Sequence, residues 1–353
     1  MRILAVTHSL QTNGAAYALV RLLVALRQAG ASVSVLHTEN HSLCEPLRAH
    51  GIEIISDCHA DNFDVAIVNT MIDFPWVLQI APHLPVLLWV HEGMSLLGGL
   101  SQHEVWNHAF RQSSRIVFYT PWQPEQVFRS VMYGVQEHRI RFVPMGVPQR
   151  PTQMPAPLRV GNRVVIGIGS IHPRKRPEDL LQAVLANADI GMQVKLLGNY
   201  EWVAQNNPVL MGLLRDHPHA LTLVGESPAS ADMLDSSFVN GHMESCGIYA
   251  SASADETFGI ANLEAAAWGL PPAVSKLPCY EGIWQHGVNA LMHPVGAADC
   301  LAWNLRALAL DAGLNQRIAA AAMQTARRFG MDRFISSMTD VLQECITDRV
   351  MPA

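Results

Sequence analysis

The sequence predicts an α/β protein of two doubly wound domains, each built on a parallel sheet. Its 353 residues exceed the usual size of one domain and suit two domains of about 150 residues each. In both halves, short apolar runs typical of buried strands alternate with amphipathic helical stretches. Four prolines between residues 148 and 157 interrupt this alternation, so neither a helix nor a central strand is expected there.

The first half opens with a βαβ unit. Residues 2–6 ("RILAV") have the pattern of a buried strand, 15–30 that of an amphipathic helix ended by Gly30, and 32–37 that of a second strand. Strands covered by helices are therefore expected throughout this half. The further strand candidates are "VAIVN" (65–69), "VLLWV" (86–90), "RIVFYT" (115–120) and "IRFVP" (140–144).

The second half repeats the alternation. Gly259 disfavours a helix interior, so the helix that Gly269 closes is expected to begin at about Ile260. The tail from residue 301 is rich in Ala and Leu and is interrupted by Gly330, which predicts two or three closing helices. The other expected elements are strands in 163–170, 193–198, 220–225, 246–251 and 271–275, and a helix in 177–188.

These patterns divide the chain into four parts. We expect a first domain over 1–148, a proline-rich linker over 149–162, a second domain over 163–330, and a C-terminal helix over 331–353 that packs back toward the first domain. Ligands of such sheets bind outside the carboxyl ends of the strands. A central cleft faced by both sheets is therefore the expected ligand site.

Composition excludes several classes of protein. Hydrophobic residues make up 49% and charged residues 15%, which is typical of a well-packed globular chain. No run of about 18 apolar residues and no signal peptide is present, which predicts a cytoplasmic protein. The net charge of −6 makes nucleic acid an unfavourable partner. The six cysteines are widely spaced without a C-x-x-C pair, as expected of reduced structural thiols.

The stretch 254–271, "ADETFGIANLEAAAWGLP", carries the strongest chemical signal. Its two glutamates, Glu256 in a loop and Glu264 on the expected helix, lie eight positions apart. The N–H groups and dipole at the start of that helix favour a phosphate. Carboxylates beside an anion site are repulsive unless they accept hydrogen bonds from hydroxyl groups. A sugar nucleotide carries hydroxyl groups on its ribose and on its hexose. We therefore expect one glutamate to bind each of the two sugars.

At this point the sequence resembles a known family. "ETFGIANLEAAAWGLP" is similar to the E-x7-E segment of retaining family-four glycosyltransferases, which have the GT-B fold of two Rossmann-like domains. The other matching segments follow in the family's order and span nearly the whole chain. They are "NGAAYALVRLLVAL", "LWVHEG", "IGIGSIHPRKRPEDLLQAV" and "YEGIWQHGVNALM".

The resemblance implies a role for each matching charged residue. Lys175 and Arg174 would neutralise the diphosphate of the donor. Glu256 would hold the transferred sugar, and Glu264 the ribose hydroxyls. His91 would contact the donor sugar near the reacting carbon. In the family's mechanism no protein nucleophile is needed, because the leaving phosphate accepts the acceptor's proton.

The resemblance also implies backbone contacts. The amides of Phe258, Gly259 and Ile260 would lie near sugar or phosphate, and Gly14 would let its loop approach the phosphates or the acceptor. Gly198 and Gly225, each closing a strand, would border the nucleoside.

Two positions depart from the family pattern. Ser170 stands five positions before Lys175, where relatives often carry Arg, so that Arg174 would substitute or phosphate binding would weaken. The usual "PNG" is "PMG" at 144–146, which removes any side-chain contact that an asparagine would make at Met145.

The expected function is a retaining hexosyltransferase reaction that moves a sugar from a nucleotide diphosphate sugar to an acceptor hydroxyl. The acceptor would be a glycan, a lipid-linked sugar or a small molecule. Two alternatives stay open: a sugar-nucleotide epimerase of the same fold, and a non-catalytic sugar-nucleotide sensor or partner subunit.

No metal ion is expected, because the chain has no Asp-x-Asp pair. No cofactor is expected either, since "GIGSIH" lacks the third glycine of a dinucleotide fingerprint and the nucleotide diphosphate sugar is the donor substrate. The amphipathic stretch 124–142 predicts a half-buried helix, with peripheral contact to the inner face of the membrane as the alternative.

Overall fold

The chain folds into two compact units. The computed structural model describes residues 1–39, 41–95, 103–151, 160–169, 171–199, 206–225 and 237–350. The first unit contains Met1–Gly146 and the C-terminal helix α12 (Met331–Val350). The second unit contains the described residues between Val147 and Gly330. Much of the proline-rich stretch, residues 152–159, lies outside the described residues, as does Ser170.

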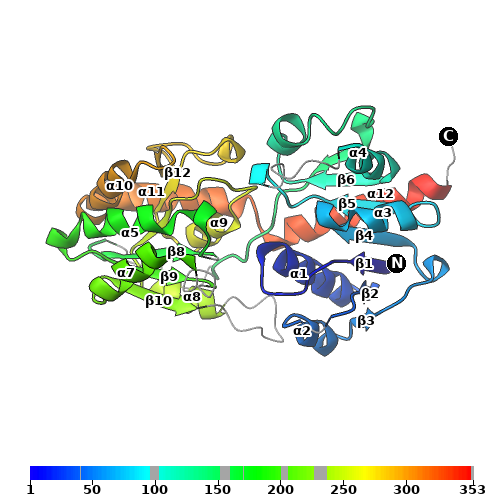
Figure 1. Ribbon diagram of the computed structural model, residues 1–353, viewed down its shortest axis with the longest axis horizontal. Coiled ribbons are helices and arrows are strands. Elements are labelled where there is room, and N and C mark those ends of the chain that lie inside the picture. Colours follow the sequence, from blue (N-terminus) through cyan, green and yellow to red (C-terminus); the bar gives the residue numbers. More distant parts are fainter. Residues whose placement is uncertain are drawn as a thin grey trace. The chain divides into compact units, whose positions relative to one another are not determined.

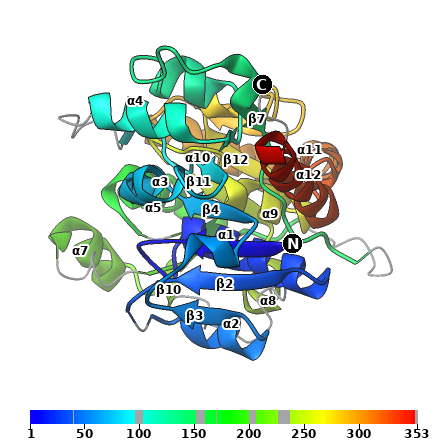
Figure 2. The same ribbon diagram turned by 90° about the vertical axis from the view of Figure 1, so that its right-hand side faces the viewer.

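The first unit is built on a seven-stranded sheet in the order β3-β2-β1-β4-β5-β6-β7, in which every pairing is parallel. Strands β2, β3 and β4 can be followed in Figure 2. The strands are β1 (Arg2–Val6), β2 (Ser32–Leu36), β3 (Glu53–Ile55), β4 (Val65–Asn69), β5 (Val86–Trp89), β6 (Arg115–Phe118) and β7 (Ile140–Phe142).

Helices follow most of these strands (Figure 1). They are α1 (Gly14–Gln28), α2 (Cys44–Ala49), α3 (Phe74–Ile80) and α4 (His103–Gln112). Helix α12 completes the unit: Arg115, at the start of β6, donates to Glu344 at 2.8 Å and to Asp348 at 2.6 Å. These pairs attach the end of the chain to the sheet, together with Phe334, whose ring lies 5.7 Å from that of Trp89.

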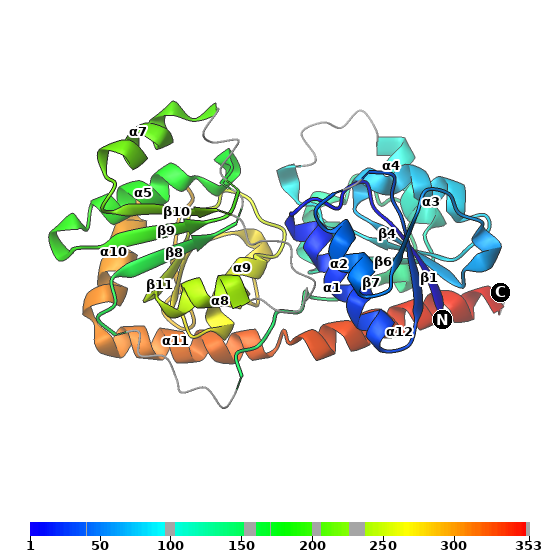
Figure 3. The same ribbon diagram turned by 90° about the horizontal axis from the view of Figure 1, so that it is seen from below.

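The second unit has a six-stranded parallel sheet in the order β10-β9-β8-β11-β12-β13. Figure 3 shows α5 on one face of it and α9 with α11 on the other. The strands are β8 (Val164–Ile168), β9 (Gln193–Leu197), β10 (Leu221–Gly225), β11 (Ile248–Ser251), β12 (Pro272–Ser275) and β13 (Leu291–His293). The helices are α5 (Pro177–Leu185), α7 (Pro208–Asp216), α8 (Ser237–Glu244), α9 (Ile260–Ala267), α10 (Ala298–Leu310) and α11 (Ala312–Arg327).

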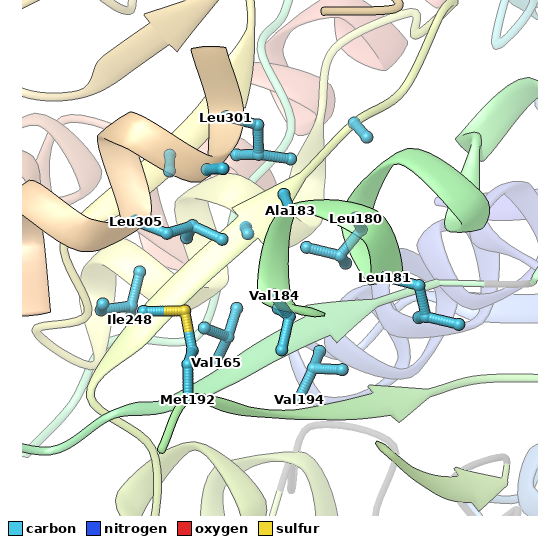
Figure 4. Close-up of a cluster of buried hydrophobic side chains, with 14 of the residues drawn as sticks. Val165, Leu180, Leu181, Ala183, Val184, Met192, Val194, Ile248, Leu301 and Leu305 are labelled. Carbon is cyan, nitrogen blue, oxygen red and sulfur yellow. The ribbon is translucent and has the colours of Figure 1, made fainter. Parts of the chain in front are cut away.

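Apolar side chains between helices and sheet form the core of each unit. In the second unit, Val165 of β8 belongs to one buried cluster with Leu180 and Val184 of α5 and with Leu301 and Leu305 of α10 (Figure 4). All five are at most 4% exposed. Because β8 is buried on both faces, its sequence is a continuous apolar run rather than an alternating one, which is typical of parallel sheets.

Each sheet has one point where the strand order reverses. In the first unit it lies between β1 and β4, and in the second between β8 and β11. The loops that follow these strands diverge there and leave a crevice, where ligands of open α/β sheets bind. The residues after β1, β4, β8 and β11 are therefore the expected positions of a ligand site.

The α/β fold predicted from the sequence is confirmed, with helix α9 beginning at Ile260 as expected. The helix predicted over 124–142 is wrong. That stretch contains a π-helical turn (Gln123–Val127), a 3₁₀ turn (Glu137–Arg139) and β7. Val127, Phe128 and Val131 face the core, whereas Tyr133 and Phe142 are exposed, and Gly134 has a φ of +72°, which a helix does not allow. Among the described helices, none is long and apolar enough to cross a membrane.

Candidate functional site

The two charged segments singled out in the sequence meet at the switch point of the second unit. Lys175 lies in the 3₁₀ turn Pro173–Lys175 after β8, and Glu256 lies in the loop after β11. Since β8 and β11 are neighbours in the sheet, their following loops are brought side by side although the two residues are 81 positions apart. Lys175 and Glu256, which follow two different strands in the sequence, thus belong to one cluster in space.

The cluster is held by several hydrogen bonds. The Lys175 ammonium and the Ser253 hydroxyl both donate to Glu256 Oε1, the latter at 2.8 Å. Glu256 Oε2 lies 3.7 Å from Arg174 Nη1, which also donates to the Asp255 carbonyl at 3.0 Å. Oε1 is therefore occupied, whereas Oε2 has only the longer ionic contact and keeps its lone pairs for a further donor.

Opposing effects act on the ionisation of Glu256. Its side chain is only 12% exposed, and burial raises the pKa of a carboxyl group. The charges of Lys175 and Arg174, with the hydrogen bonds from Lys175 and Ser253, outweigh this and lower the pKa below its usual value. Glu256 is thus an ionised carboxylate at neutral pH, suited to accept hydrogen bonds from hydroxyl groups.

The backbone between the two glutamates takes a form that only glycine allows. Gly259 has a φ of +76°, and a Cβ there would lie 2.7 Å from the ring of Tyr280, which is 1% exposed. Phe258 is 2% exposed, and its ring centre lies 5.7 Å from that of Phe329. Its side chain therefore belongs to the core, so that Phe258, Gly259 and Ile260 have mainly their backbone groups to offer a ligand.

The remaining predicted residues of this unit lie around the same edge of the sheet. Glu264 is on α9 and half-buried. Gly198 follows β9 and Gly225 is the last residue of β10, and a hydrogen bond of 2.8 Å joins Gly198 N to Gly225 O. A small cavity of about 40 Å³ opens beside Lys175, with Gly167, Gly169, Ser251 and Ser253 among its lining residues.

In the first unit, His91 follows β5 and takes part in a chain of hydrogen bonds. Its Nε2 lies 2.7 Å from Asn69 Oδ1, and its Nδ1 contacts the Tyr119 hydroxyl. An amide oxygen only accepts, so Nε2 carries the proton and Nδ1 accepts from Tyr119. Burial lowers the pKa of His91 to about 3, which keeps the ring neutral. Both ring nitrogens are thus engaged by protein groups, and its predicted contact with a donor sugar stays a prediction.

Gly14 is the first residue of α1, whose N-terminus is capped by the Asn13 side chain. Asn69 Nδ2 donates to the neighbouring Ala15 carbonyl at 3.5 Å, which links this loop to His91. A Cβ on Gly14 would meet nothing within 4 Å. The residue leaves open space at the helix start, in keeping with the predicted close approach of a ligand.

Sequence reasoning missed the residues that hold the predicted ones in place. Ser253 orients Glu256, while Asn69 and Tyr119 fix the ring of His91. One signal was available, since Asn69 ends β4 and Tyr119 directly follows β6, and both are polar residues after apolar runs. No pattern in the sequence distinguishes Ser253 from the other serines.

A larger cavity, of about 360 Å³, lies elsewhere in the first unit. It is lined by residues that precede β5, β6 and β7, at the edge of the sheet opposite to His91, together with Arg115 and Asp348. The charge of Arg115 is balanced there by Glu344 and Asp348. This cavity contains none of the residues that the sequence singled out.

Two family models match the chain in the two places where these clusters occur. Glycosyl-transferase family 4 matches residues 1–98, which include Gly14 and His91. Glycosyl transferases group 1 matches residues 150–325, which include Lys175, Glu256 and Glu264. The chain belongs to the group 1 glycosyl transferases.

Known proteins similar to this glycosyl transferase agree with the assignment. A curated relative, the D-inositol 3-phosphate glycosyltransferase of Xylanimonas cellulosilytica, is 26% identical over 262 residues, which are 67% of this chain. The chain spans 58% of that relative's length.

Solved structures show the fold. HepE of Anabaena, crystallised with UDP-glucose, is 18% identical with a TM-score of 0.80, covering 97% of this chain and 99% of its own. Sucrose-phosphate synthase of Thermosynechococcus elongatus is 15% identical with a TM-score of 0.76, covering 98% and 99%. The chain therefore has the GT-B fold, as the resemblance predicted.

Proposed function

We propose that this chain transfers a sugar from a nucleotide diphosphate sugar to an acceptor hydroxyl with retention of the anomeric configuration. The observation that carries the proposal is the cluster of Lys175, Arg174 and Glu256 at the switch point of the second unit. It combines two cations, for a diphosphate, with an ionised carboxylate, for sugar hydroxyls. HepE, which has the same fold, was crystallised with UDP-glucose and with UDP and glucose.

The cations act on the leaving group. As the bond between the sugar and the diphosphate breaks, negative charge grows on the departing diphosphate. Fixed positive groups therefore stabilise the transition state more than the ground state. Lys175 and Arg174 provide two such groups, and the first turn of α9 provides N–H donors and a favourable dipole. The carboxylate of Glu256 both holds Lys175 in place and offers Oε2 to the transferred sugar.

The two glutamates divide the recognition of the donor. Glu256 binds the transferred sugar, and Glu264, further along α9, binds the ribose hydroxyls. Gly198 and Gly225 border the nucleoside, and His91 of the first unit lies near the reacting carbon. The acceptor is a hydroxyl of a glycan, a lipid-linked sugar or a small molecule. A cytoplasmic location is supported by six cysteines that are all unpaired, as is usual in a reducing compartment.

Replacing Glu264 with alanine should weaken donor binding by about 1–3 kcal/mol, or roughly 5- to 150-fold in Kd, because ribose hydroxyls lose a charged acceptor. Isothermal titration with the nucleoside diphosphate alone measures this. E281A, which removes an exposed carboxylate of the same unit, is the control. An unchanged nucleotide affinity in E264A would contradict the ribose assignment.

Transfer should continue in EDTA. We propose that the reaction needs no metal ion, because Lys175, Arg174 and α9 supply the positive charge that a divalent ion supplies to other sugar-nucleotide enzymes. Rates measured after chelation, and again after addition of Mg²⁺ or Mn²⁺, test this. A rate that collapses in EDTA and returns with the ion would refute the electrostatic assignment.

A thermal-shift screen identifies the donor. A true donor at 100 times its Kd should stabilise the protein by roughly 2.7 kcal/mol. UDP-, GDP-, ADP-, TDP- and CMP-sugars form the panel, with the free sugars as controls. If no member of the panel raises Tm, the proposed donor class is wrong.

A further inference from the structure

The larger cavity of the first unit, of about 360 Å³, lies entirely within that unit. It is lined by the segments that precede β5, β6 and β7 and by the end of α12. Its volume is in the range of roughly 300–1000 Å³ that is typical of small-molecule sites. None of the residues assigned to the donor lines it. A ligand of this cavity would therefore be a second one, in addition to the donor.

A buried arginine forms part of the cavity wall. Arg115, the first residue of β6, has a side chain that is only 6% exposed. Its Nε donates to Glu344 at 2.8 Å, and its Nη1 donates to Asp348 at 2.6 Å and to the Ser114 carbonyl at 2.9 Å. These bonds fix the guanidinium plane, and within the described part of the chain no group accepts from Nη2. One N–H group of a fixed cation is thus left for a ligand.

A second arginine of the cavity is held in a similar way. Arg139, in the 3₁₀ turn before β7, donates through Nη1 to the carbonyls of Arg111 at 2.7 Å and of Ser113 at 3.4 Å. Its Nε and Nη2 have no acceptor among the residues that the structure describes. The end of α4 and the loop to β6 therefore anchor both arginines. The two cations are in place before any ligand binds, which lowers the entropy cost of binding.

Positive charge is in excess at the cavity. Its described lining carries the guanidinium groups of Arg115 and Arg139 and the carboxylate of Asp348, besides two imidazoles. Glu344, which also pairs with Arg115, is shared with Arg141, whose Nη2 lies 2.7 Å from it. Guanidinium groups with unshared N–H donors bind phosphate through strong, charge-assisted hydrogen bonds. The lining therefore suits a phosphate group.

Asp348 adds a hydrogen-bond acceptor to the same cavity. Its side chain is 52% exposed, and its Oδ2 accepts from Arg115, while Oδ1 has no donor among the described residues. A carboxylate repels a phosphate that lies against it, but it accepts a hydrogen bond from a hydroxyl group. A ligand that carries both a phosphate and hydroxyl groups satisfies the arginines and the aspartate, whereas inorganic phosphate satisfies only the arginines.

We propose that this cavity binds a phosphomonoester of a small hydroxylated molecule, such as a sugar phosphate. The free N–H groups of Arg115 and Arg139 bind the phosphate, and a ligand hydroxyl donates to Asp348. The site goes beyond the proposed function and does not depend on it. Because such a ligand contacts β6, the turn before β7 and α12 together, its binding stabilises the attachment of α12 to the sheet.

Isothermal titration of the full chain with glucose 6-phosphate and with glycerol 3-phosphate tests the proposal. Both should bind, inorganic phosphate should bind more weakly, and glucose should not bind. R139Q removes a charged donor and should weaken binding of the esters by about 10- to 150-fold. D348N removes a negative charge beside the phosphate, so it should bind inorganic phosphate more tightly than the wild type. A structural role alone does not produce these opposite effects.

Two further variants locate the site. R129Q removes an exposed arginine of the same unit that does not line the cavity, and it should bind both esters as the wild type does. K175A should also bind them normally. Binding that is lost in K175A and kept in R139Q would place the esters at the donor site and overturn the proposal. Absence of sugar transfer with every donor would instead contradict the proposed function and leave this site unaffected.

Hydrogen exchange of the wild-type chain supplies a measurement that needs no variant. Glucose 6-phosphate should slow amide exchange in α12 and in residues 137–142. Failure of both esters to bind, or binding without protection of these segments, would overturn the proposal. Vesicles of phosphatidylglycerol test the other source of a phosphate with hydroxyl groups. Sedimentation of the chain with such vesicles that R139Q abolishes, without binding of the soluble esters, would assign the arginines to a lipid headgroup instead.

Discussion

Replacing Lys175 with alanine should slow sugar transfer at saturating donor by about 100- to 1000-fold, the loss that follows removal of one group aimed at developing negative charge. Donor affinity should fall less, because the ammonium is needed most when the diphosphate departs. The substitution also removes a cation that lowers the pKa of Glu256, so that carboxylate should protonate at a higher pH than in the wild type. Steady-state kinetics from pH 5 to 9 measure both effects.

Lys195 provides the matched control for this experiment. It is a lysine of the same unit whose ammonium donates to Ser245 at 2.8 Å, away from Glu256. K195A should therefore leave the rate unchanged. If K175A lost donor affinity by a factor of about 100 to 1000 while kcat stayed unaltered, Lys175 would be a binding residue only. The electrostatic account of leaving-group departure would then be wrong.

The second large effect is expected for Gly259→Ala. The new methyl group would lie 2.7 Å from the ring of the buried Tyr280, at a φ of +76° that L residues rarely adopt. Backbone strain of about 1–3 kcal/mol and overpacking of similar size should lower Tm by several degrees. The start of α9 would shift, and nucleotide affinity should fall with it. Thermal unfolding and titration calorimetry of the same samples measure the two losses.

The substitution of Gly282 separates the cost of backbone strain from the cost of overpacking. Its φ is +74°, almost that of Gly259, but a Cβ there would meet nothing within 4 Å. G282A should thus show the backbone cost alone and bind nucleotide normally. If G259A were as stable as G282A and bound nucleotide as well, the close packing of this turn against Tyr280 would have no functional role.

The sequence predicted much of the second-unit site because its signals are local. Helix α9 begins at Ile260, since Gly259 ends the loop and the following residues strongly favour a helix. The likeness to known motifs then singled out Lys175 and Glu256. Their ion pair, across 81 positions, is a consequence of strand order, which places β8 beside β11.

Strand order also explains what could not be predicted. Arg115 and Arg139 are unremarkable in sequence, and the pairing of β6 with β7 brings them to the same cavity. The helix predicted over 124–142 is wrong for a different reason. Its apolar spacing suits a helix, yet Val127, Phe128 and Val131 reach the core from successive turns, because tertiary packing overrides local periodicity.

The most direct test of the central claim is an NMR assay of the purified chain with its donor, in EDTA, with and without an acceptor. We expect release of the nucleoside diphosphate that depends on the acceptor, and a new glycosidic signal with the anomeric configuration of the donor. A product of opposite configuration would contradict retention. Conversion of the donor sugar without acceptor would indicate an epimerase, and binding without turnover across a broad acceptor panel would indicate a sugar-nucleotide sensor.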